Sequence, residues 1–327
     1  MRMDCYNSPM TDSPRVLAVG LATLDVVQVV ERLPGPDEKL VARSVDVDAG
    51  GPALNAARTA ALLGCDVTLV TVVGAGAIGE AVRAGLGAVR LDDRATGAAG
   101  AAVSTVLVTA GTGERAVVST NATGVVVQAE APDLTGVCAV LVDGHHLDLA
   151  LATAAEARRL GIPVLLDGGS WKPGLEALLA HVDVALLSAD FRLPADLALP
   201  AAGAALSSGS LLADVARLGP TVVAQSHGAG AIEVLAHSRA ATVPVPRAGR
   251  VVDTLGAGDV LHGALLACLA AGPRALGAVV VDALAVAAEV ASASVAAPGA
   301  LGWARDGANA GQLRCDAARF RSKCEVP

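Results

Sequence analysis

Apolar runs typical of buried strands alternate with helical stretches along most of this chain. The strand-like runs lie at 16–20, 67–73, 137–142, 164–166, 184–187, 221–224 and 232–235. Between them, stretches 53–63 and 149–160 have helical composition, and each is followed by a glycine, Gly64 and Gly161. Repeated strand-then-helix units pack as a mostly parallel sheet with helices on both faces. The sequence therefore predicts an α/β fold with three layers, α/β/α.

Two stretches depart from this alternation. Residues 38–48 alternate apolar and polar side chains, as a half-exposed strand would, and 101–119 predict two strands around the turn Thr112-Gly113-Glu114. These are expected to be additional antiparallel strands. The two ends, 1–14 and 305–327, lack apolar periodicity and are predicted to be flexible tails, which leaves 15–304 as one domain.

The segment Val252-Asp253-Thr254-Leu255-Gly256-Ala257-Gly258-Asp259 carries the strongest chemical signal. It follows an expected strand at 243–252, which two prolines interrupt, and opens an expected helix at 258–271, with a further helix at 274–296. Glycines let free N–H groups converge at the positive end of a helix dipole, where an anion is stabilised. Asp259 adds a carboxylate beside that position. Phosphoryl transfer to a hydroxyl needs this combination, although an acid at a helix start can also serve only to stabilise the helix.

A second motif lies near the other end of the chain. Ala49-Gly50-Gly51-Pro52-Ala53-Leu54-Asn55-Ala56-Ala57 is followed by Gly64 and Gly74. Together with the segment at 253–259, this motif resembles the two signature regions of the PfkB family of carbohydrate and nucleoside kinases, which have the ribokinase-like fold. The two motifs occur in the family's order, and weaker similarity extends from about Val16 to Trp303.

The resemblance implies an ATP-dependent kinase that phosphorylates a hydroxyl of a sugar or sugar-like small molecule. It implies Asp259 as the general base, with the backbone of Gly256, Ala257 and Gly258 as an anion hole. It also implies a small β lid over the sugar site, with strands within 36–50 and 98–122, through which subunits of the family often pair as homodimers.

Further site residues follow from the same resemblance. Those implied to bind the acceptor are Asp25, Gly50, Gly51 and Asn55, and those implied to bind the nucleotide are Ser226, Gly228, Thr254, Gly256 and Gly258. Mg²⁺ is expected to arrive with ATP and to keep several waters. Asp253 is expected either to support a monovalent-cation loop that holds K⁺ or only to cap the turn.

Several positions depart from the family's pattern. The family's N-x-x-E motif would fall near Leu187, where this chain has Ser188-Ala189-Asp190-Phe191, and Ala75 and Gly76 stand where an Asp is usual. These departures leave open a catalytically weak sugar-binding relative, whereas the presence of Asp259 favours an active kinase. The sequence fixes neither the sugar nor the hydroxyl that is phosphorylated.

One motif points to another class of enzyme. Gly74-Ala75-Gly76-Ala77-Ile78-Gly79 matches the G-x-G-x-x-G pattern, follows an expected strand and precedes a helical stretch, with Asp92 18 residues after Gly74. This is the arrangement of a dinucleotide-binding turn, and it makes an NAD(P)-dependent oxidoreductase the alternative function. That alternative leaves the segment at 253–259 unexplained.

Composition restricts the partners. The net charge is −8 and the chain has only three lysines, so nucleic acids and anionic membranes are poor candidates. The six cysteines are scattered without a C-x-x-C pair, which is typical of reduced thiols. There is no signal-peptide pattern at the start, and the most apolar helical stretch contains Asp282 and Glu289. A cytoplasmic location is therefore expected.

Overall fold

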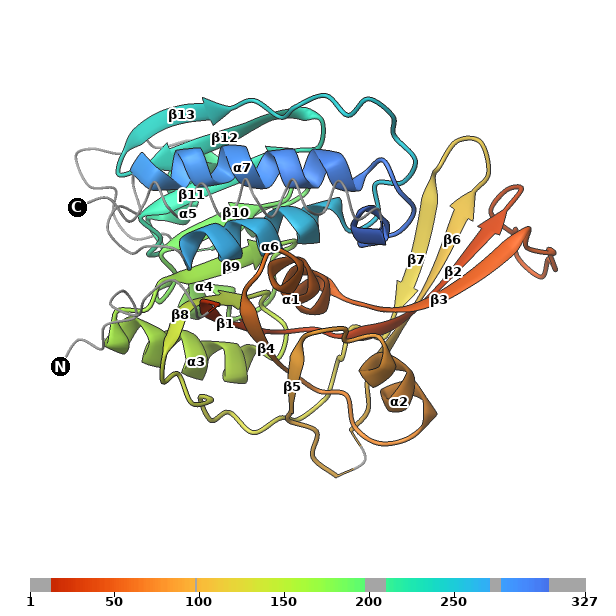
Figure 1. Ribbon diagram of the computed structural model, residues 1–327, viewed down its shortest axis with the longest axis horizontal. Coiled ribbons are helices and arrows are strands. Elements are labelled where there is room, and N and C mark those ends of the chain that lie inside the picture. The colour runs from red at the N-terminus through yellow and green to blue at the C-terminus, as the bar shows by residue number, and fades with distance from the viewer. Residues whose placement is uncertain (1–12, 98, 198–209, 271–277, 306–327) are drawn as a thin grey trace.

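The computed structural model describes residues 13–97, 99–197, 210–270 and 278–305, and it contains two sheets (Figure 1). The large sheet consists of β1 (Arg15–Val19), β4 (Asp66–Thr71), β5 (Arg90–Asp93), β8 (Val137–Val142), β9 (Val164–Gly168), β10 (Val184–Leu187), β11 (Val222–His227), β12 (Gly230–Ala236) and β13 (Arg239–Val243). Its strand order is β13-β12-β11-β10-β9-β8-β1-β4-β5. The pairings are parallel from β5 to β11 and antiparallel for β11–β12 and β12–β13. The mostly parallel sheet is thus confirmed.

Helices cover both faces of this sheet. One layer contains α1 (Pro52–Leu62), α6 (Ala257–Leu269) and α7 (Ala278–Ser294), and the other contains α3 (Leu147–Leu160), α4 (Leu175–Leu179) and α5 (Leu211–Ala216). Successive side chains of a strand point to opposite faces. In β1, Val16 and Ala18 accordingly pack with the α1 layer, whereas Leu17 and Val19 pack with the α3 layer. The predicted α/β/α layering is therefore confirmed.

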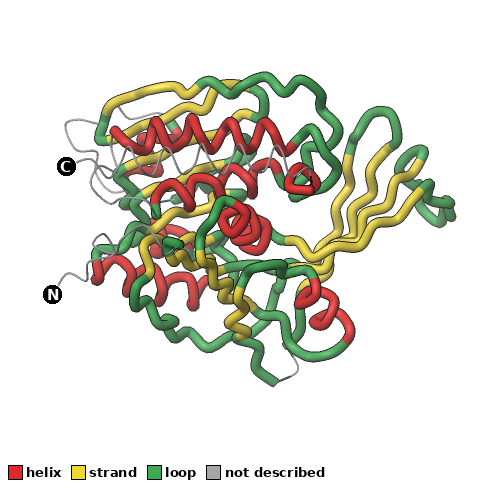
Figure 2. Tube along the Cα trace, in the orientation of Figure 1, coloured by secondary structure: helices red, strands yellow, loops and turns green. Residues whose placement is uncertain are grey.

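The small sheet projects from one side of the body (Figure 2). It consists of β2 (Thr23–Val30), β3 (Ser44–Gly50), β6 (Ala102–Thr109) and β7 (Arg115–Ser119), in the order β3-β2-β6-β7. Strands β3, β6 and β7 lie within the ranges expected for the lid, but β2 was not predicted. Because β2 pairs with β6 in parallel, the expectation of antiparallel strands alone was wrong for this pairing. A short helix, α2 (Ala77–Ala84), contacts β2 and β3 at the base of the lid.

Two other expectations need correction. The expected strand at 243–252 does not form: β13 ends at Val243, immediately before Pro244, and proline cannot donate to a strand ladder. The expected strand at 38–48 begins only at Ser44. The proposed tails lie outside the described residues, apart from 13–14 and Arg305, which ends a short 3₁₀ helix (Gly302–Arg305). Among the helices in the described ranges, none combines the length and apolar character needed to cross a membrane.

A close contact between α1 and α6 fixes the relative position of the two signature motifs. Gly263 of α6 lies against the backbone of Ala56 in α1, and an added Cβ would collide with the Ala56 carbonyl oxygen and would lie 2.7 Å from Cβ of Thr59. Small residues at a helix crossing let the backbones approach, and no larger residue fits this crossing without moving a helix. The contact therefore holds the start of α1 beside the start of α6.

We expect Gly263→Ala to destabilise the protein, although alanine is the better helix former by about 1 kcal/mol. Overpacking costs about 1–3 kcal/mol, and here the obstacle is backbone rather than a flexible side chain. A fall of a few degrees in Tm is expected, measured by differential scanning calorimetry. Gly258→Ala is the control in the same helix, because nothing lies within 4 Å of its added Cβ. Equal Tm values for Gly263→Ala and wild type would contradict the close-packing argument.

Candidate active site

The carboxyl ends of the parallel strands, the start of α6 and the base of the lid meet in one region. In open α/β sheets, ligands bind beyond the carboxyl ends of the strands. Asp143 directly follows β8 and Asp167 is near the end of β9, while Gly50 ends β3 just before α1 begins. Residues distant in sequence are thereby brought to the edge of the sheet where catalytic groups are expected.

The turn before α6 has the conformation that the sequence predicted. Gly256 has φ +73° and directly precedes the helix, and an added Cβ there would collide with Ala300, so the position requires glycine. The amide of Ala257 donates to the Thr254 carbonyl oxygen (3.3 Å). Thr254 and Gly258 are exposed, and Asp259 lies half-buried in the first turn of α6. The helix therefore presents its N-terminal N–H groups beside a carboxylate.

Asp253 ties this turn to the segment after α7. Its Oδ1 accepts from the amide of Leu255 (2.9 Å) and its Oδ2 from the amide of Gly299 (2.9 Å). The amide of Val252 also donates to the carbonyl oxygen of Val295 (2.7 Å). The capping role considered for Asp253 is thus observed, and each carboxylate oxygen keeps a lone pair.

Asn55 joins the two signature motifs directly. Its Nδ2 donates to Oδ2 of Asp259 at 2.8 Å, across 204 positions of sequence. Asn55 is buried near the start of α1, which follows Gly51. Sequence analysis placed Asn55 on the acceptor; the structure shows that its amide N–H₂ is used, at least in part, to hold Asp259.

Asp25 lies on lid strand β2 rather than in a turn after β1. Its Oδ1 accepts from the hydroxyl of Thr23 (2.5 Å), and a Cβ added at Gly50 would collide with its carboxylate. In the sheet register, Asp25 stands between Asp48 of β3 and Ser104 of β6. Burial raises the pKa of Asp25 against the hydrogen bonds from Thr23 and Ser104, and the charge of Asp48 adds to the rise. Asp25 and Gly50 thus form one polar position at the base of the lid.

The surroundings of Asp259 favour its protonated form more than water would. Burial by the surrounding protein, together with the negative charge of Asp167, raises the pKa of Asp259 to about 7. The hydrogen bond from Asn55 and the nearby His262 act in the opposite direction. A carboxylate with a pKa near the working pH is suited to act as a general base.

Asp143, Asp167 and His262 were not predicted from the sequence as parts of the site. Asp143 is buried and accepts from the amides of Leu21 and His145, both at 2.8 Å. Burial alone would raise its pKa, but His145 and these amides outweigh burial and hold the pKa well below its usual range. Both carboxylates stand at the carboxyl ends of predicted parallel strands, and this position was the signal that could have identified them.

Two of the residues expected to bind the nucleotide, Ser226 and Gly228, lie on a separate hairpin, whereas the other three lie around the start of α6. The Ser226 hydroxyl donates to the carbonyl oxygen of Leu187 at the end of β10 (3.3 Å), and Gly228 lies in the tight turn between β11 and β12. His262 of α6 contacts the neighbouring carbonyl oxygen of Leu186 (3.0 Å). The hairpin and α6 therefore meet at the same strand end. Asp190, which follows β10, is exposed.

The glycine turn at 74–79 is tied at its start to Asp93 of β5. Asp93 accepts from the amides of Val73 (3.0 Å) and Gly74 (3.1 Å) and pairs with Arg83 at 2.6 Å. A dinucleotide-binding turn needs such N–H groups for pyrophosphate. Asp92, considered as the ribose ligand of that alternative, instead pairs with Arg94 at 2.7 Å. Within the turn, the Gly74 amide is therefore already used by Asp93.

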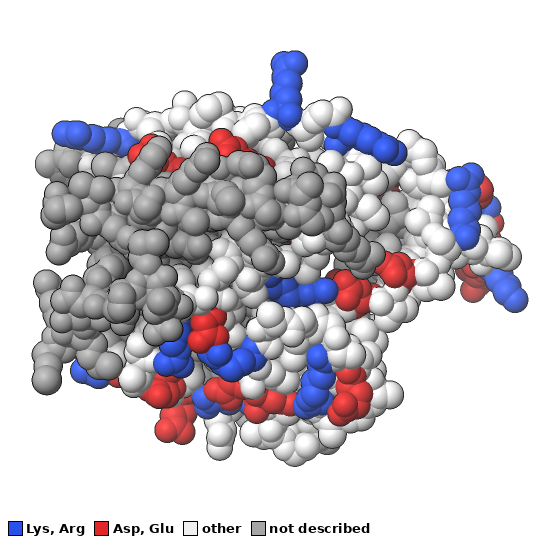
Figure 3. Space-filling model, in the orientation of Figure 1, with Lys and Arg blue, Asp and Glu red and all other residues white. Residues whose placement is uncertain are grey.

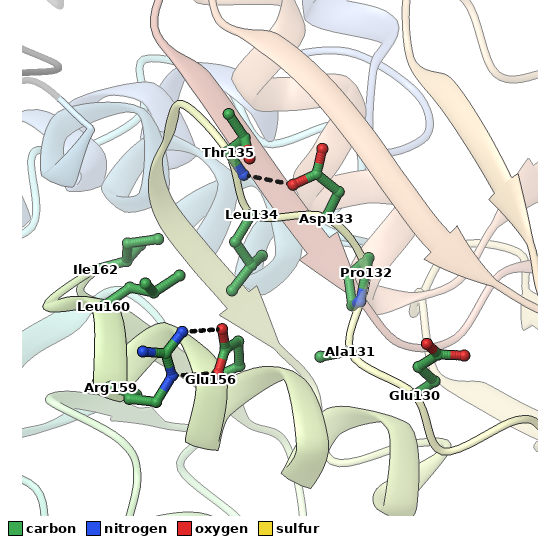
Figure 4. A pocket seen from close by; sticks show the side chains of 10 residues that line it. All are labelled: Glu130, Ala131, Pro132, Asp133, Leu134, Thr135, Glu156, Arg159, Leu160 and Ile162. Atoms are coloured by element: carbon green, nitrogen blue, oxygen red, sulfur yellow. Dashed lines mark hydrogen bonds and ion pairs between the residues drawn. The ribbon is translucent and has the colours of Figure 1, made fainter. Parts of the chain in front are cut away.

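A separate pocket lies near the amino ends of β8 and β9, whereas the candidate site lies at the carboxyl ends of the strands (Figure 4). It lies between the segment that leads into β8 and the end of α3, and its floor carries the ion pair of Arg159 with Glu156 (2.6 Å). Figure 3 shows that, on the face in view, Lys and Arg side chains of the described residues are interspersed with Asp and Glu.

Comparison with known proteins gives the family. The model of the pfkB family of carbohydrate kinases matches residues 13–304. This chain therefore belongs to the pfkB carbohydrate kinase family and is a carbohydrate kinase, a class that uses ATP. The oxidoreductase alternative was therefore wrong.

Solved structures of ribokinases share the fold. The ribokinase of Arabidopsis thaliana, complexed with ribose and ATP, superposes with a TM-score of 0.70 at 20% identity, covering 93% of this chain and 99% of that one. The ribokinase of Giardia lamblia gives a TM-score of 0.71 at 18% identity, with 93% and 100% covered. That of Cryptococcus neoformans, in complex with ADP, gives 0.64 at 18%, with 90% and 97% covered. At these identities the likeness establishes the ribokinase-like fold.

We expect ATP or ADP, but not NAD(H) or NADP(H), to raise the Tm of the protein. A ligand that binds only the folded state stabilises it by about 2.7 kcal/mol when its concentration is 100 times Kd. Thermal-shift measurements over a nucleotide concentration series provide the check. Stabilisation by NAD(H) without stabilisation by an adenine nucleotide would contradict our interpretation of the turns at 74–79 and 256–259.

Proposed function

We propose that this kinase transfers the γ-phosphoryl group of ATP to a hydroxyl of a sugar or sugar-like molecule, with Asp259 as the general base. The single observation that carries this proposal is the Asn55–Asp259 hydrogen bond of 2.8 Å at the start of α6. It unites the two signature motifs at a helix N-terminus that can bind an anion. Asn55 holds Oδ2, and we assign Oδ1 as the oxygen that meets the acceptor.

The proposed reaction balances within these groups. Oδ1 of Asp259 takes the hydroxyl proton as the hydroxyl oxygen attacks the γ-phosphorus, and the bond to the β-bridging oxygen breaks to release ADP. The N–H groups of Gly256 and Gly258, together with that of Ala257 once it leaves the Thr254 carbonyl oxygen, would stabilise charge on the transferred phosphoryl group. Asp25, Gly50, Gly51 and Asn55 would hold the acceptor, and Ser226, Gly228 and Thr254 the nucleotide.

Metal ions are proposed in two places. Mg²⁺ would be carried by the phosphates of ATP with retained waters, because the family's N-x-x-E residues are replaced by Ser188 and Phe191. K⁺ would bind near Asp253, whose oxygens keep lone pairs after accepting from two amides. Comparing turnover in KCl with turnover in an equal concentration of tetramethylammonium chloride tests the second site.

We also propose a homodimer through the lid. The face of the lid that carries Val45, Val47 and Val118 is exposed, and Val47, Val26, Thr105 and Val118 form one cross-strand row on it. Apolar rows exposed on a sheet mark interaction sites. A monomeric mass in sedimentation equilibrium at micromolar concentration would contradict this assembly.

We expect Asp259→Asn to reduce kcat by about 10²–10⁴-fold while adenine-nucleotide binding and Tm change little. The substitution keeps the shape of the side chain and the glycines of the turn, and it removes only the base. ADP release with a panel of sugars and nucleosides identifies the acceptor and supplies the assay. Near wild-type turnover of the variant would show that Asp259 is not the base. If no acceptor stimulated ADP release by the wild type, the sugar-binding relative would be favoured.

We expect Asp25→Ala to raise the KM for the acceptor by about tenfold or more, with little change in the KM for ATP. Loss of Asp25 would leave a buried hydroxyl of the acceptor unpaired, which costs roughly 1–3 kcal/mol. The KM for ATP should change little because Asp25 lies on lid strand β2, apart from α6. Steady-state kinetics with each substrate varied in turn separate the two constants. Asp46→Ala, on the neighbouring lid strand, is the matched control for removing an acid from this sheet. A larger effect on ATP than on the acceptor would count against the assignment.

A further inference from the structure

His262 is a buried residue of α6, one helical turn after Asp259, and its ring is surrounded by oxygen acceptors. Its Nδ1 lies 2.7 Å from the carbonyl oxygen of Gly258, and its Nε2 lies 3.0 Å from the carbonyl oxygen of Leu186. A carboxylate oxygen, Oδ2 of Asp167, lies 3.3 Å from Nδ1. Carbonyl oxygens accept and cannot donate, so both ring nitrogens must carry a proton to satisfy these contacts.

A neutral ring would leave one of these contacts as a repulsion between lone pairs. It would place an unprotonated nitrogen against a carbonyl oxygen at 2.7 or 3.0 Å in a site where His262 is 5% exposed. Buried polar atoms without partners cost about 1–3 kcal/mol each. The geometry therefore favours the imidazolium, which has two N–H donors and a positive charge.

Asp167 supplies the matching negative charge. It is 6% exposed, and its Oδ2 has no hydrogen-bond donor other than the His262 ring within reach among the described residues. A buried carboxylate is stable only when it is paired or protonated. Burial raises the pKa of Asp167, and the positive charge of His262 opposes that rise. The 3.3 Å contact between Nδ1 of His262 and Oδ2 of Asp167 is thus the position of a buried ion pair when both groups are charged.

We infer that His262 is a positioning residue for phosphoryl transfer: its protonated ring holds the Gly258 carbonyl in place and offsets the charge of Asp167, so that Asp259 can be ionised. This inference rests on the proposed role of Asp259 as the base. Two uncompensated carboxylates at this site would resist ionising together. The ion pair leaves Asp259 as the carboxylate that exchanges a proton with the acceptor.

The other groups around this site do not take over the role of His262. Around Asp167 and Asp259, Asp143 follows β8 and adds negative charge, while Lys172 and His145 act on Asp167. Lys172 donates to the backbone carbonyl of Asp143 (3.4 Å), and His145 pairs with the Asp143 carboxylate (3.2 Å). Asn55, on α1, is neutral. Of the cations named, only His262 lies on the helix that carries Asp259.

The pH dependence of kcat/KM tests the inference through shifts of opposite sign. Asp259 must be ionised to take a proton, so kcat/KM of the wild type should fall as the pH drops through about 7. Loss of a nearby positive charge raises a carboxylate pKa, so His262→Asn and His262→Gln should each move the midpoint of this fall upward by roughly one pH unit. Loss of a nearby negative charge lowers a carboxylate pKa, so Asp167→Asn should move the midpoint to a lower pH. The double variant His262→Asn/Asp167→Asn should lie near the wild type.

The choice of variants separates charge from shape. Asparagine places an amide N–H near the position of Nδ1 and glutamine near that of Nε2, so each keeps one contact and neither carries a charge. A purely structural role would lower kcat without moving the midpoint, and unshifted midpoints in all three single variants would overturn the inference. Failure of the proposed function is distinguished because it shows as unchanged turnover in Asp259→Asn.

A second measurement needs neither turnover nor an identified acceptor. In the full-length chain with ¹⁵N-labelled histidine, at least one ring should show protons on both nitrogens at pH 7, and one such signal should be missing from His262→Asn. His145→Asn is the control, because His145 also faces a carboxylate and its removal should leave the signal in place. A singly protonated ring for His262 at pH 7 would overturn the inference whatever the kinetics show.

Discussion

The contact of Gly263 with the backbone of Ala56 is the constraint on which the site depends. It allows two helices that begin 205 positions apart, at Pro52 and Ala257, to cross without a side chain between them. Their starts are then close enough for Asn55 to donate to Asp259 at 2.8 Å. A hydrogen bond of this length tolerates little displacement, so a shift of one helix by the radius of a methyl group would separate the pair. The precision of the site thus comes from the absence of a side chain at the crossing.

The same region holds three carboxyl groups that the protein shields from water. Asp143 and Asp167 are almost fully buried at the ends of adjacent strands, and Asp259 stands above them. Each carboxylate is stabilised differently: Asp143 by two amides, Asp259 by the amide side chain of Asn55, and Asp167 by the His262 ring. The environment lowers the pKa of Asp143, whereas burial raises the pKa values of Asp167 and Asp259, so chemically identical groups in one site differ in how readily they ionise.

The sequence predicted the layers of the fold and the two signature motifs because these features depend on local pattern. Apolar periodicity marks strands and helices, and glycines mark turns, so the turn at 256–259 and helix α1 could be placed in advance. Strand β2 was missed because pairing with β6 is a long-range contact across about 80 residues, and the alternation of Thr23–Val30 is interrupted by Val26-Val27. The strand expected at 243–252 failed at its prolines, where the absence of an N–H overrode the apolar composition.

The site was predictable only in part for a related reason. Asp259 and Asn55 belong to motifs, and only its place at the end of a strand marks Asp167. His262 becomes a functional candidate through its contact with Asp167, 95 positions away in the sequence. The sequence also could not show that Asp93 accepts a hydrogen bond from the Gly74 amide at the start of the turn at 74–79. That contact depends on the pairing of β5 with β4. A side chain that hydrogen-bonds to a glycine turn from a distant strand can be identified only when the pairing of the strands is known.

The position of Asp25 on a lid strand has a consequence for how such enzymes diversify. The proposed acceptor contact belongs to a four-stranded sheet that projects from the body, whereas the proposed base and anion-binding turn belong to α6. Under this proposal, substitutions along β2, β3, β6 and β7 reshape the acceptor side without disturbing the packed crossing of α1 and α6. A lineage could then exchange one acceptor for another while keeping the proposed phosphoryl-transfer groups unchanged.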